Sequence, residues 1–246
     1  MNFLSSALLG LIQGLTEFLP VSSSGHLVLA QSLIPGFSQP GVLFDVTLHL
    51  GTLLAVVFYF RKQLFSLSKN YIFFLFIATL PAVLAGVLFG DYLEELFSSA
   101  SATAYQLLIT GVLNIVVDYL PKGEGRLTLK NTALMGFAQA IAIIPGISRS
   151  GATIFSGVAA RVDRAKVAEF SFLLSIPAIL GAMVYQLAKY GVGSVEHPTY
   201  YIVGFLISLV VGFFSIRIVF KFLLGRLFKV FGVYAILLGL AFLLLQ

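Results

Sequence analysis

The sequence contains no cysteine and no tryptophan, and only 10% of its 246 residues are Asp, Glu, Lys or Arg. The absence of cysteine excludes disulfide bonds, thiolate catalysis and cysteine-ligated metal centres. The low charge excludes an ordinary soluble domain, in which about a quarter of the residues are charged. The sequence also lacks a long hydrophilic segment, so we expect no soluble domain in addition to the apolar part.

Apolar residues dominate the chain: 59% of it is hydrophobic, and the mean hydropathy is +1.02. Six runs approach the ~20 residues that an α-helix needs to cross a bilayer, and none alternates as barrel strands do. They cover residues 42–60, 71–90, 102–120, 167–189, 200–221 and 229–246. We therefore predict an all-α integral membrane protein with six transmembrane helices, forming a single membrane domain over residues 1–246.

Two further apolar regions are interrupted by proline and by polar residues. Residues 2–34 break at Pro20 and the sequence VSSSGH, and residues 132–160 break at Pro145 and the sequence GISRSG. Each half is too short to cross a bilayer alone. We predict that both regions form re-entrant helical hairpins, which enter and leave the membrane on the same side.

Nearly all of the 15 Lys and Arg residues fall on one side of the predicted helices. They lie in four stretches, at residues 61–69, 122–130, 161–166 and 217–229. The positive-inside rule places this side in the cytoplasm, and both chain termini then lie outside. This placement accounts for the net charge of +5 without a nucleic-acid partner.

The two halves of the chain, about residues 1–122 and 127–246, resemble each other at an offset of 126 positions. Four polar or glycine positions match: Gln13 with Gln139, Ser22 with Ser148, Ser24 with Ser150, and Gly25 with Gly151. Each half holds one hairpin and three crossings, an odd number, so the halves run in opposite directions through the membrane. The sequence therefore predicts an inverted-topology repeat, a plan common among transporters.

The polar hairpin tips predict an anion-binding site. Irregular backbone is tolerated at membrane depth only where it lines a protein or water-filled cavity. Loops of Ser and Gly that start helices expose backbone N–H groups at the positive end of a helix dipole, which attracts anions. If the loops at residues 22–25 and 148–151 converge, Arg149 lies between them, and its guanidinium suits phosphate oxygens. This arrangement favours a diphosphate as the ligand.

Glu17 and His26 flank the first serine loop. Gln13 and Glu17 are four residues apart, so they share one helix face. A carboxylate, a hydroxyl and an imidazole beside a phosphate cradle resemble a base, a nucleophile and an acid. The plainer interpretations are that Glu17 reaches the membrane interface, that the serines cap a helix and that His26 bonds to the loop. Asp45 and His49, at the start of a predicted span, are candidates for a supporting or merely interfacial role.

The stretches QGLTEFLPVSSSGH and IPGISRSGATI resemble motifs of the undecaprenyl-diphosphate phosphatase family, the bacitracin-resistance type of membrane phosphatase. FDVTLHLGTLLAV and EFSFLLSIPA are also similar to segments of that family, so the resemblance covers essentially the whole chain. It implies hydrolysis of a C55 polyprenyl diphosphate to the monophosphate and phosphate at the outer face of the cell membrane. The reaction would recycle the lipid carrier for cell-wall synthesis and confer bacitracin resistance. The resemblance further implies a divalent cation, Mg²⁺ or Ca²⁺, and a homodimer.

The resemblance also implies roles for individual residues. Ser23 matches the proposed nucleophile, Glu17 a catalytic carboxylate and metal ligand, and His26 and Arg149 the family's histidine and essential arginine. Gln13 stands where the family often has a second Glu, which leaves one carboxylate for the mechanism. The residues expected to bind the diphosphate are Gln13, Ser22, Ser24, Gly25, Ser148, Ser150, Gly151 and Thr153.

Other functions fit parts of the pattern. Carriers are also built from inverted repeats with a site at mid-membrane, so a polyprenyl-phosphate flippase is the alternative. A membrane scaffold would leave the polar hairpin tips unexplained. The sequence leaves open whether Ser23 or a water molecule attacks the phosphorus, and which divalent cation takes part.

Overall fold

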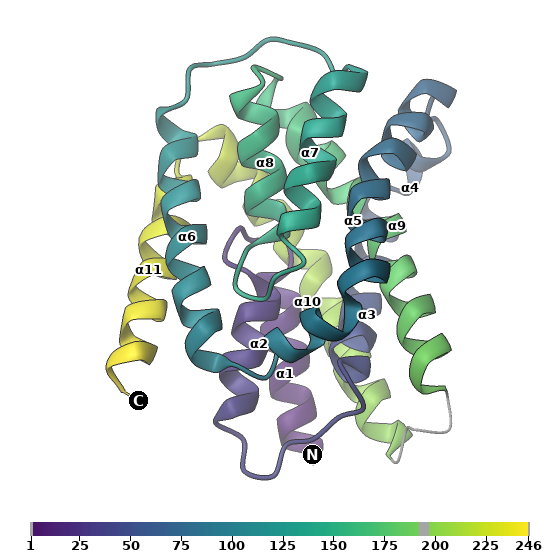
Figure 1. Cartoon of the computed structure of the whole chain (residues 1–246). Coiled ribbons are helices and arrows are strands. Elements are labelled where there is room, and N and C mark those ends of the chain that lie inside the picture. The colour runs from purple at the N-terminus through teal and green to yellow at the C-terminus, as the bar shows by residue number, and fades with distance from the viewer. Residues whose placement is uncertain (1, 192–196, 246) are drawn as a thin grey trace.

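The computed structural model describes residues 2–191 and 197–245, and this part of the chain is all-helical (Figure 1). The helices are α1 Phe3–Thr16, α2 Ser23–Ser32, α3 Leu43–Tyr59, α4 Arg61–Leu64, α5 Lys69–Leu96, α6 Ala100–Tyr119, α7 Leu129–Ile141, α8 Arg149–Ala159, α9 Arg164–Tyr190, α10 Pro198–Leu224 and α11 Phe228–Leu244. Both ends of the chain lie at the same end of the bundle.

Four helices within the described residues are long and apolar enough to cross a membrane: α5, α6, α9 and α10. The other two predicted spans correspond to α3 and α11, which are apolar helices of 17 residues each. The protein is therefore a multi-pass membrane protein made of helices, as predicted. Two long helices begin before the apolar run because polar side chains cap them: Ser68 caps α5, and Asp163 caps α9.

The two interrupted regions form the helix pairs α1–α2 and α7–α8, as their sequences predict. The helix α2 begins where the Ser22 hydroxyl accepts a hydrogen bond from Gly25 N–H at 3.2 Å. The Ser148 hydroxyl does the same for α8, accepting from Gly151 N–H at 3.0 Å. In Figure 1 the two pairs approach from opposite ends of the bundle, and their turns meet near its middle.

The two turns are in direct contact. A Cβ atom added to Gly25 would lie 3.0 Å from the Cα atom of Gly146. The backbones of the two turns are therefore too close for a larger residue than glycine at this position. The Ser150 hydroxyl donates to the carbonyl oxygen of Leu19 at 3.3 Å. The predicted convergence of the two serine loops is therefore present in the structure.

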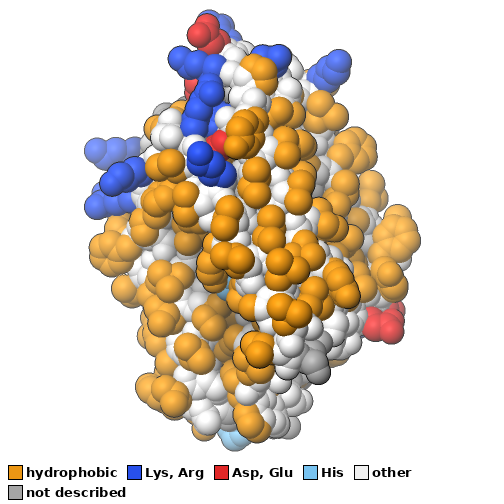
Figure 2. All heavy atoms as spheres, turned by 90° about the vertical axis from the view of Figure 1, so that its left-hand side faces the viewer, with side chains coloured by type: hydrophobic (Ala, Val, Ile, Leu, Met, Phe, Trp, Pro, Cys, Tyr) orange, Lys and Arg blue, Asp and Glu red, His pale blue; other side chains and the backbone are white. Residues whose placement is uncertain are grey.

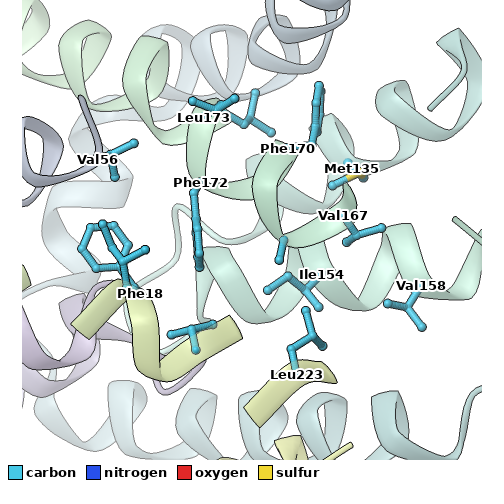
Figure 3. Close-up of a cluster of buried hydrophobic side chains, with 14 of the residues drawn as sticks. Phe18, Val56, Met135, Ile154, Val158, Val167, Phe170, Phe172, Leu173 and Leu223 are labelled. Atoms are coloured by element: carbon cyan, nitrogen blue, oxygen red, sulfur yellow. The ribbon is translucent and has the colours of Figure 1, made fainter. Parts of the chain in front are cut away.

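A large hydrophobic cluster packs behind the turns (Figure 3). Phe18, which follows Glu17 directly in the first turn, is fully buried and meets the ring of Phe172 edge-on at 5.5 Å. Burial of a phenylalanine side chain contributes about 1.5–3 kcal/mol, so the cluster anchors the turn that carries the site. The labelled members come from α3, α7, α8, α9 and α10 as well as from the first turn: Phe18, Val56, Met135, Ile154, Val158, Val167, Phe170, Phe172, Leu173 and Leu223.

Glycine residues let the hairpins pack tightly against the long helices. A Cβ atom on Gly10 of α1 would lie 2.5 Å from the carbonyl oxygen of Gly204 on α10. A Cβ atom on Gly136 of α7 would lie 2.6 Å from the carbonyl oxygen of Ala78 on α5. Because backbone cannot move aside as a flexible side chain can, neither position accepts a larger residue without separating the helices.

Gly10→Val is therefore expected to destabilise the protein by about 1–3 kcal/mol, because overpacking forces α1 away from α10. The measurement is thermal or denaturant unfolding of the purified protein in detergent. Gly86→Ala is the matched control, since a Cβ atom there meets nothing within 4 Å. Equal unfolding transitions for the two variants would contradict this description of the α1–α10 contact.

Candidate active site

Glu17, at the C-terminal end of α1, is the centre of the site and is buried, with only 5% of its surface exposed. Its Oε2 atom accepts hydrogen bonds from Ser23 Oγ at 2.6 Å and from Gln13 Nε2 at 2.9 Å. His49 Nε2, on α3, lies 3.3 Å from the same oxygen. The Oε1 atom pairs with the guanidinium of Arg149, at the start of α8. One carboxylate therefore connects both hairpins with α3.

The ion pair explains how a carboxylate is tolerated at this depth. An unpaired buried charge costs several kcal/mol, and the cost is offset only where a partner and hydrogen bonds satisfy it. Arg149 is held in turn by the carbonyl oxygen of Ser171 on α9, to which its Nη1 donates at 3.1 Å. Arg149 and Glu17 thus have fixed positions before any ligand binds.

The helix α6 positions both turns through two side chains that sequence reasoning missed. Asn114 donates a hydrogen bond to the carbonyl oxygen of Pro20 in the first turn. Thr110 donates to the carbonyl oxygen of Gly146 at 2.8 Å and accepts from Ser148 N–H at 2.9 Å in the second. Thr110 and Asn114 are four residues apart, so a single face of α6 supports the two turns.

Both turns contain backbone that L-amino acids rarely adopt. Ser22 has a φ of 67°, which costs a non-glycine residue about 1–3 kcal/mol. Gly146 has a φ of 90°, and a Cβ atom there would lie 2.6 Å from the carbonyl oxygen of Thr103. Such strain persists only where surrounding contacts enforce it, and the capping serines and α6 provide those contacts here.

A cavity of about 310 Å³ opens beside Glu17. Its polar end is formed by predicted site residues: Glu17, Ser22, Ser23, Ser24, Ser148 and Arg149. From there the cavity continues between α5 and α9, where its walls are mainly apolar: Ala82, Val83, Gly86, Val87, Ala178, Ile179, Gly181 and Ala182. The polar residues that these two helices add to the lining are Thr79, Glu94, Tyr185 and Gln186. A small polar end with a long apolar extension suits a ligand with a charged head and a hydrocarbon tail.

The remaining residues predicted to bind the diphosphate lie around the cavity rather than in its lining. Gln13 donates a hydrogen bond to the Glu17 carboxylate, and Ser150 donates one to the carbonyl oxygen of Leu19 in the first turn. Thr153 packs beside Arg149, and its hydroxyl lies 2.7 Å from that of Ser171. Gly25 and Gly151 supply the N–H groups that the capping serines accept.

The structure does not bring His26 to Glu17. The ring of His26 bonds through Nδ1 to the carbonyl oxygen of Ser22 and through Nε2 to the hydroxyl of Tyr234 on α11, both at 2.8 Å. His49 lies beside Glu17 instead, because His49 Nδ1 bonds to its own helix at the carbonyl oxygen of Asp45, 2.7 Å away. The catalytic role of His26 stays a prediction.

The surroundings of Glu17 do not fit a divalent cation. Both of its oxygens are occupied, and one of them faces a guanidinium, so a cation there would have to displace Arg149 or Ser23. Among residues 2–191 and 197–245, no group of three or more His, Cys, Asp or Glu side chains gathers as metal ligands. Glu17 as a metal ligand is therefore an expectation that this geometry does not support.

Comparisons with known proteins give a consistent result. Residues 6–241 match the family described as Bacitracin resistance protein BacA. A protein of Bacillus thuringiensis subsp. konkukian named undecaprenyl-diphosphatase 4 is 40% identical over 255 residues. The alignment covers 100% of this chain and 98% of the length of that relative. Proteins named undecaprenyl-diphosphatase from Syntrophotalea carbinolica and Methanobrevibacter smithii are 41% and 37% identical. These alignments cover 97% and 98% of this chain, and 97% and 96% of the relatives.

Proposed function

The chain belongs to the Bacitracin resistance protein BacA family, and we propose that it hydrolyses undecaprenyl diphosphate to undecaprenyl phosphate and inorganic phosphate. The observation that carries this proposal is the Ser23 hydroxyl, bonded at 2.6 Å to the buried Glu17 beside Arg149, at the polar end of a mainly apolar cavity. The reaction recycles the lipid carrier of cell-wall synthesis. The names of the relatives give no support to the flippase alternative.

In the proposed reaction, Ser23 Oγ attacks the terminal phosphorus while Glu17 accepts the hydroxyl proton. The bond from phosphorus to the bridging oxygen breaks, and its electron pair leaves with the lipid monophosphate. A water molecule then attacks the phosphoserine, and inorganic phosphate departs as Ser23 regains a proton. Arg149 stabilises the charge on the transferred group, and its hold on Glu17 weakens when that carboxylate becomes neutral.

The first-turn N–H groups of α2 and α8 add to this stabilisation. The first amides of a helix have no partner within it, and they lie at the positive end of the dipole. Because the two helices start at Ser23 and at Arg149, both sets of amides surround the polar end of the cavity. Two helix N-termini and one guanidinium together attract a negatively charged diphosphate.

We assign the apolar part of the cavity to the first isoprene units of the lipid. Each buried methylene contributes about 0.8 kcal/mol, so even a short stretch of chain adds appreciable binding energy. Gly86 on α5 and Gly181 on α9 widen the cavity, since a Cβ atom at either meets nothing within 4 Å. The rest of the polyprenyl chain extends into the bilayer.

We infer that the fold is an inverted repeat with six crossings (α3, α5, α6, α9, α10 and α11) and two re-entrant hairpins. Helix packing supports this: α1 contacts α10 as α7 contacts α5, and α3 contacts α10 as α9 contacts α5. The close contacts of Gly10 with Gly204 and of Gly136 with Ala78 join positions that correspond at the offset of 126. The helices of each half therefore pack against corresponding helices of the other half.

We further propose that the termini and the mouth of the cavity face outward. Figure 2 shows an apolar face whose Lys and Arg side chains gather at one end, the end expected in the cytoplasm. The chain termini lie at the other end. We expect the cavity to open toward that end too, through the part that Glu94 and Phe97 line. The diphosphate would then be hydrolysed on the outer side.

Ser23→Ala, Glu17→Gln and Arg149→Gln should each lower phosphate release from undecaprenyl diphosphate by at least about 10²-fold, because each removes a group that acts in the transition state. The assay uses purified protein in detergent, with the unfolding temperature as a check on folding. Ser66→Ala, an exposed serine at the opposite end of the fold, is the control. Near-normal turnover in any of the three would overturn the assigned role, and a wild-type protein that releases no phosphate would favour a carrier.

Gly181→Phe should fill the apolar part of the cavity and reduce activity on the C55 substrate while sparing methyl diphosphate, a C1 substrate without isoprene units. A Cβ atom at Gly181 meets nothing within 4 Å, and the unfolding temperature of the variant serves as the check on folding. The measurement is the ratio of kcat/KM for the two chain lengths, which we expect to fall at least tenfold. An unchanged ratio would place the tail elsewhere.

The orientation of the protein in the membrane can be tested by labelling introduced cysteines, because the chain has no cysteine of its own that would react. In intact cells, a membrane-impermeant maleimide should label Ser38→Cys but not Ser66→Cys, both of which are exposed. After the membrane is permeabilised, both should react. The reverse pattern would show that the site faces the cytoplasm.

A further inference from the structure

His49, on α3, meets the Glu17 carboxylate at the oxygen that also binds the proposed nucleophile. Its Nε2 atom lies 3.3 Å from Glu17 Oε2, and the same oxygen accepts the hydrogen bond from Ser23 Oγ at 2.6 Å. The His49 side chain lines the cavity beside Glu17 and is 21% exposed. The reaction proposed for Ser23 and Glu17 gives this histidine no role, although it touches the base directly.

The hydrogen-bond partners of the His49 ring show which nitrogens carry protons. Nδ1 faces the carbonyl oxygen of Asp45 at 2.7 Å, and a carbonyl oxygen can only accept. Nε2 faces the carboxylate of Glu17, which is paired with Arg149, and an ionised carboxylate also only accepts. Both ring nitrogens must therefore donate, and His49 is an imidazolium.

The charges around the ring agree with this assignment. Among the described residues that line the cavity, the other charged groups are three acids and one base: Glu17, Asp45, Glu94 and Arg149. Glu17 contacts the ring, and Asp45 lies one helical turn before it on α3. Two acids next to the ring favour its charged form.

His26 has a different pair of partners. Its Nδ1 also faces a carbonyl oxygen, that of Ser22, but its Nε2 faces the hydroxyl of Tyr234, which can donate as well as accept. A neutral ring with its proton on Nδ1 satisfies both contacts of His26. The two histidines therefore differ in the proton on Nε2.

A closed ring of hydrogen bonds fixes the direction in which His49 points. Gln13 Nε2 donates to Glu17 Oε2 at 2.9 Å and to Thr52 Oγ1 at 3.3 Å. The Thr52 hydroxyl donates in turn to the carbonyl oxygen of His49 at 2.9 Å. The side chain of His49 completes the ring at Glu17. The first hairpin and α3 thus hold one another at the base of the site.

We propose that His49 is a positioning residue for the hydrolysis: its Nε2–H group holds Glu17 Oε2 against the Ser23 hydroxyl. When Ser23 attacks, its proton passes to Glu17 Oε2 and His49 keeps both of its own, so the histidine changes the geometry of the base and not the proton count. This role rests on the proposed function. The proton on His49 Nε2 rests on the hydrogen-bond geometry alone and can be tested without a substrate.

The first test is nuclear magnetic resonance of the full-length purified protein in detergent, with ¹⁵N-labelled histidine, at neutral pH and without lipid substrate. The chain has three histidines, and His49→Gln and His26→Gln assign their signals. His49 should carry a proton on both ring nitrogens, whereas His26 should carry one on Nδ1 alone. A His49 ring without a proton on Nε2 would overturn the proposal.

The second test is the rate of phosphate release from undecaprenyl diphosphate. His49→Phe keeps a ring but removes the donor, so kcat should fall at least tenfold while KM stays within about threefold. His49→Gln replaces Nε2–H by an amide donor and should restore kcat to within about threefold of wild type, which a packing role alone would not produce. His197→Phe, an exposed histidine before α10, is the matched control.

Wild-type kcat in His49→Phe would overturn the proposal, as would a His49→Gln protein that is as slow as His49→Phe. The unfolding temperature checks that each variant folds, and the resonance experiment on the wild type decides the matter if His49→Phe does not. A wild-type protein that releases no phosphate would overturn the proposed function and leave the protonation of His49 as measured.

Discussion

The fold of this protein converges on one carboxylate. Glu17 accepts hydrogen bonds from Ser23 and Gln13 on its own hairpin, contacts His49 on α3 and pairs with Arg149 on the opposite hairpin. The two turns cannot separate without stranding a buried acid or a buried guanidinium. The same contact that joins the halves of the chain therefore also positions the proposed nucleophile against its base.

Placing irregular backbone inside an apolar protein requires partners for its polar groups, and the rest of the architecture follows from that requirement. Each capping serine satisfies one first-turn amide, that of Gly25 in α2 and that of Gly151 in α8, and Thr110 and Asn114 on α6 bond to the two turns. Phe18 and its aromatic neighbours form a packed cluster that separates the first turn from the hydrocarbon of the bilayer. The apolar part of the cavity lies between α5 and α9, which is the path that we propose for the lipid tail.

The sequence predicts the elements well because their signals are local. Apolar runs give the long helices, and Pro20 and Pro145 with their serine loops give the two hairpins. The meeting of Ser23 and Arg149 could also be predicted, since the internal repeat implies opposed tips. The choice between His26 and His49 could not be predicted, because it depends on how α2 and α3 are rotated about their axes, and no pattern within either helix reports that rotation. The roles of Thr110 and Asn114 depend likewise on contacts with turns far away in sequence.

The most direct test of this account is a double-mutant cycle between Glu17 and Arg149, measured as the free energy of unfolding in detergent for the wild type, Glu17→Gln, Arg149→Gln and the double variant. If the carboxylate joins the two hairpins, the double variant should be more stable than the sum of the single effects implies, by about 1–3 kcal/mol. Effects that add to within about 0.5 kcal/mol would show that the two residues do not interact, and the account would fail.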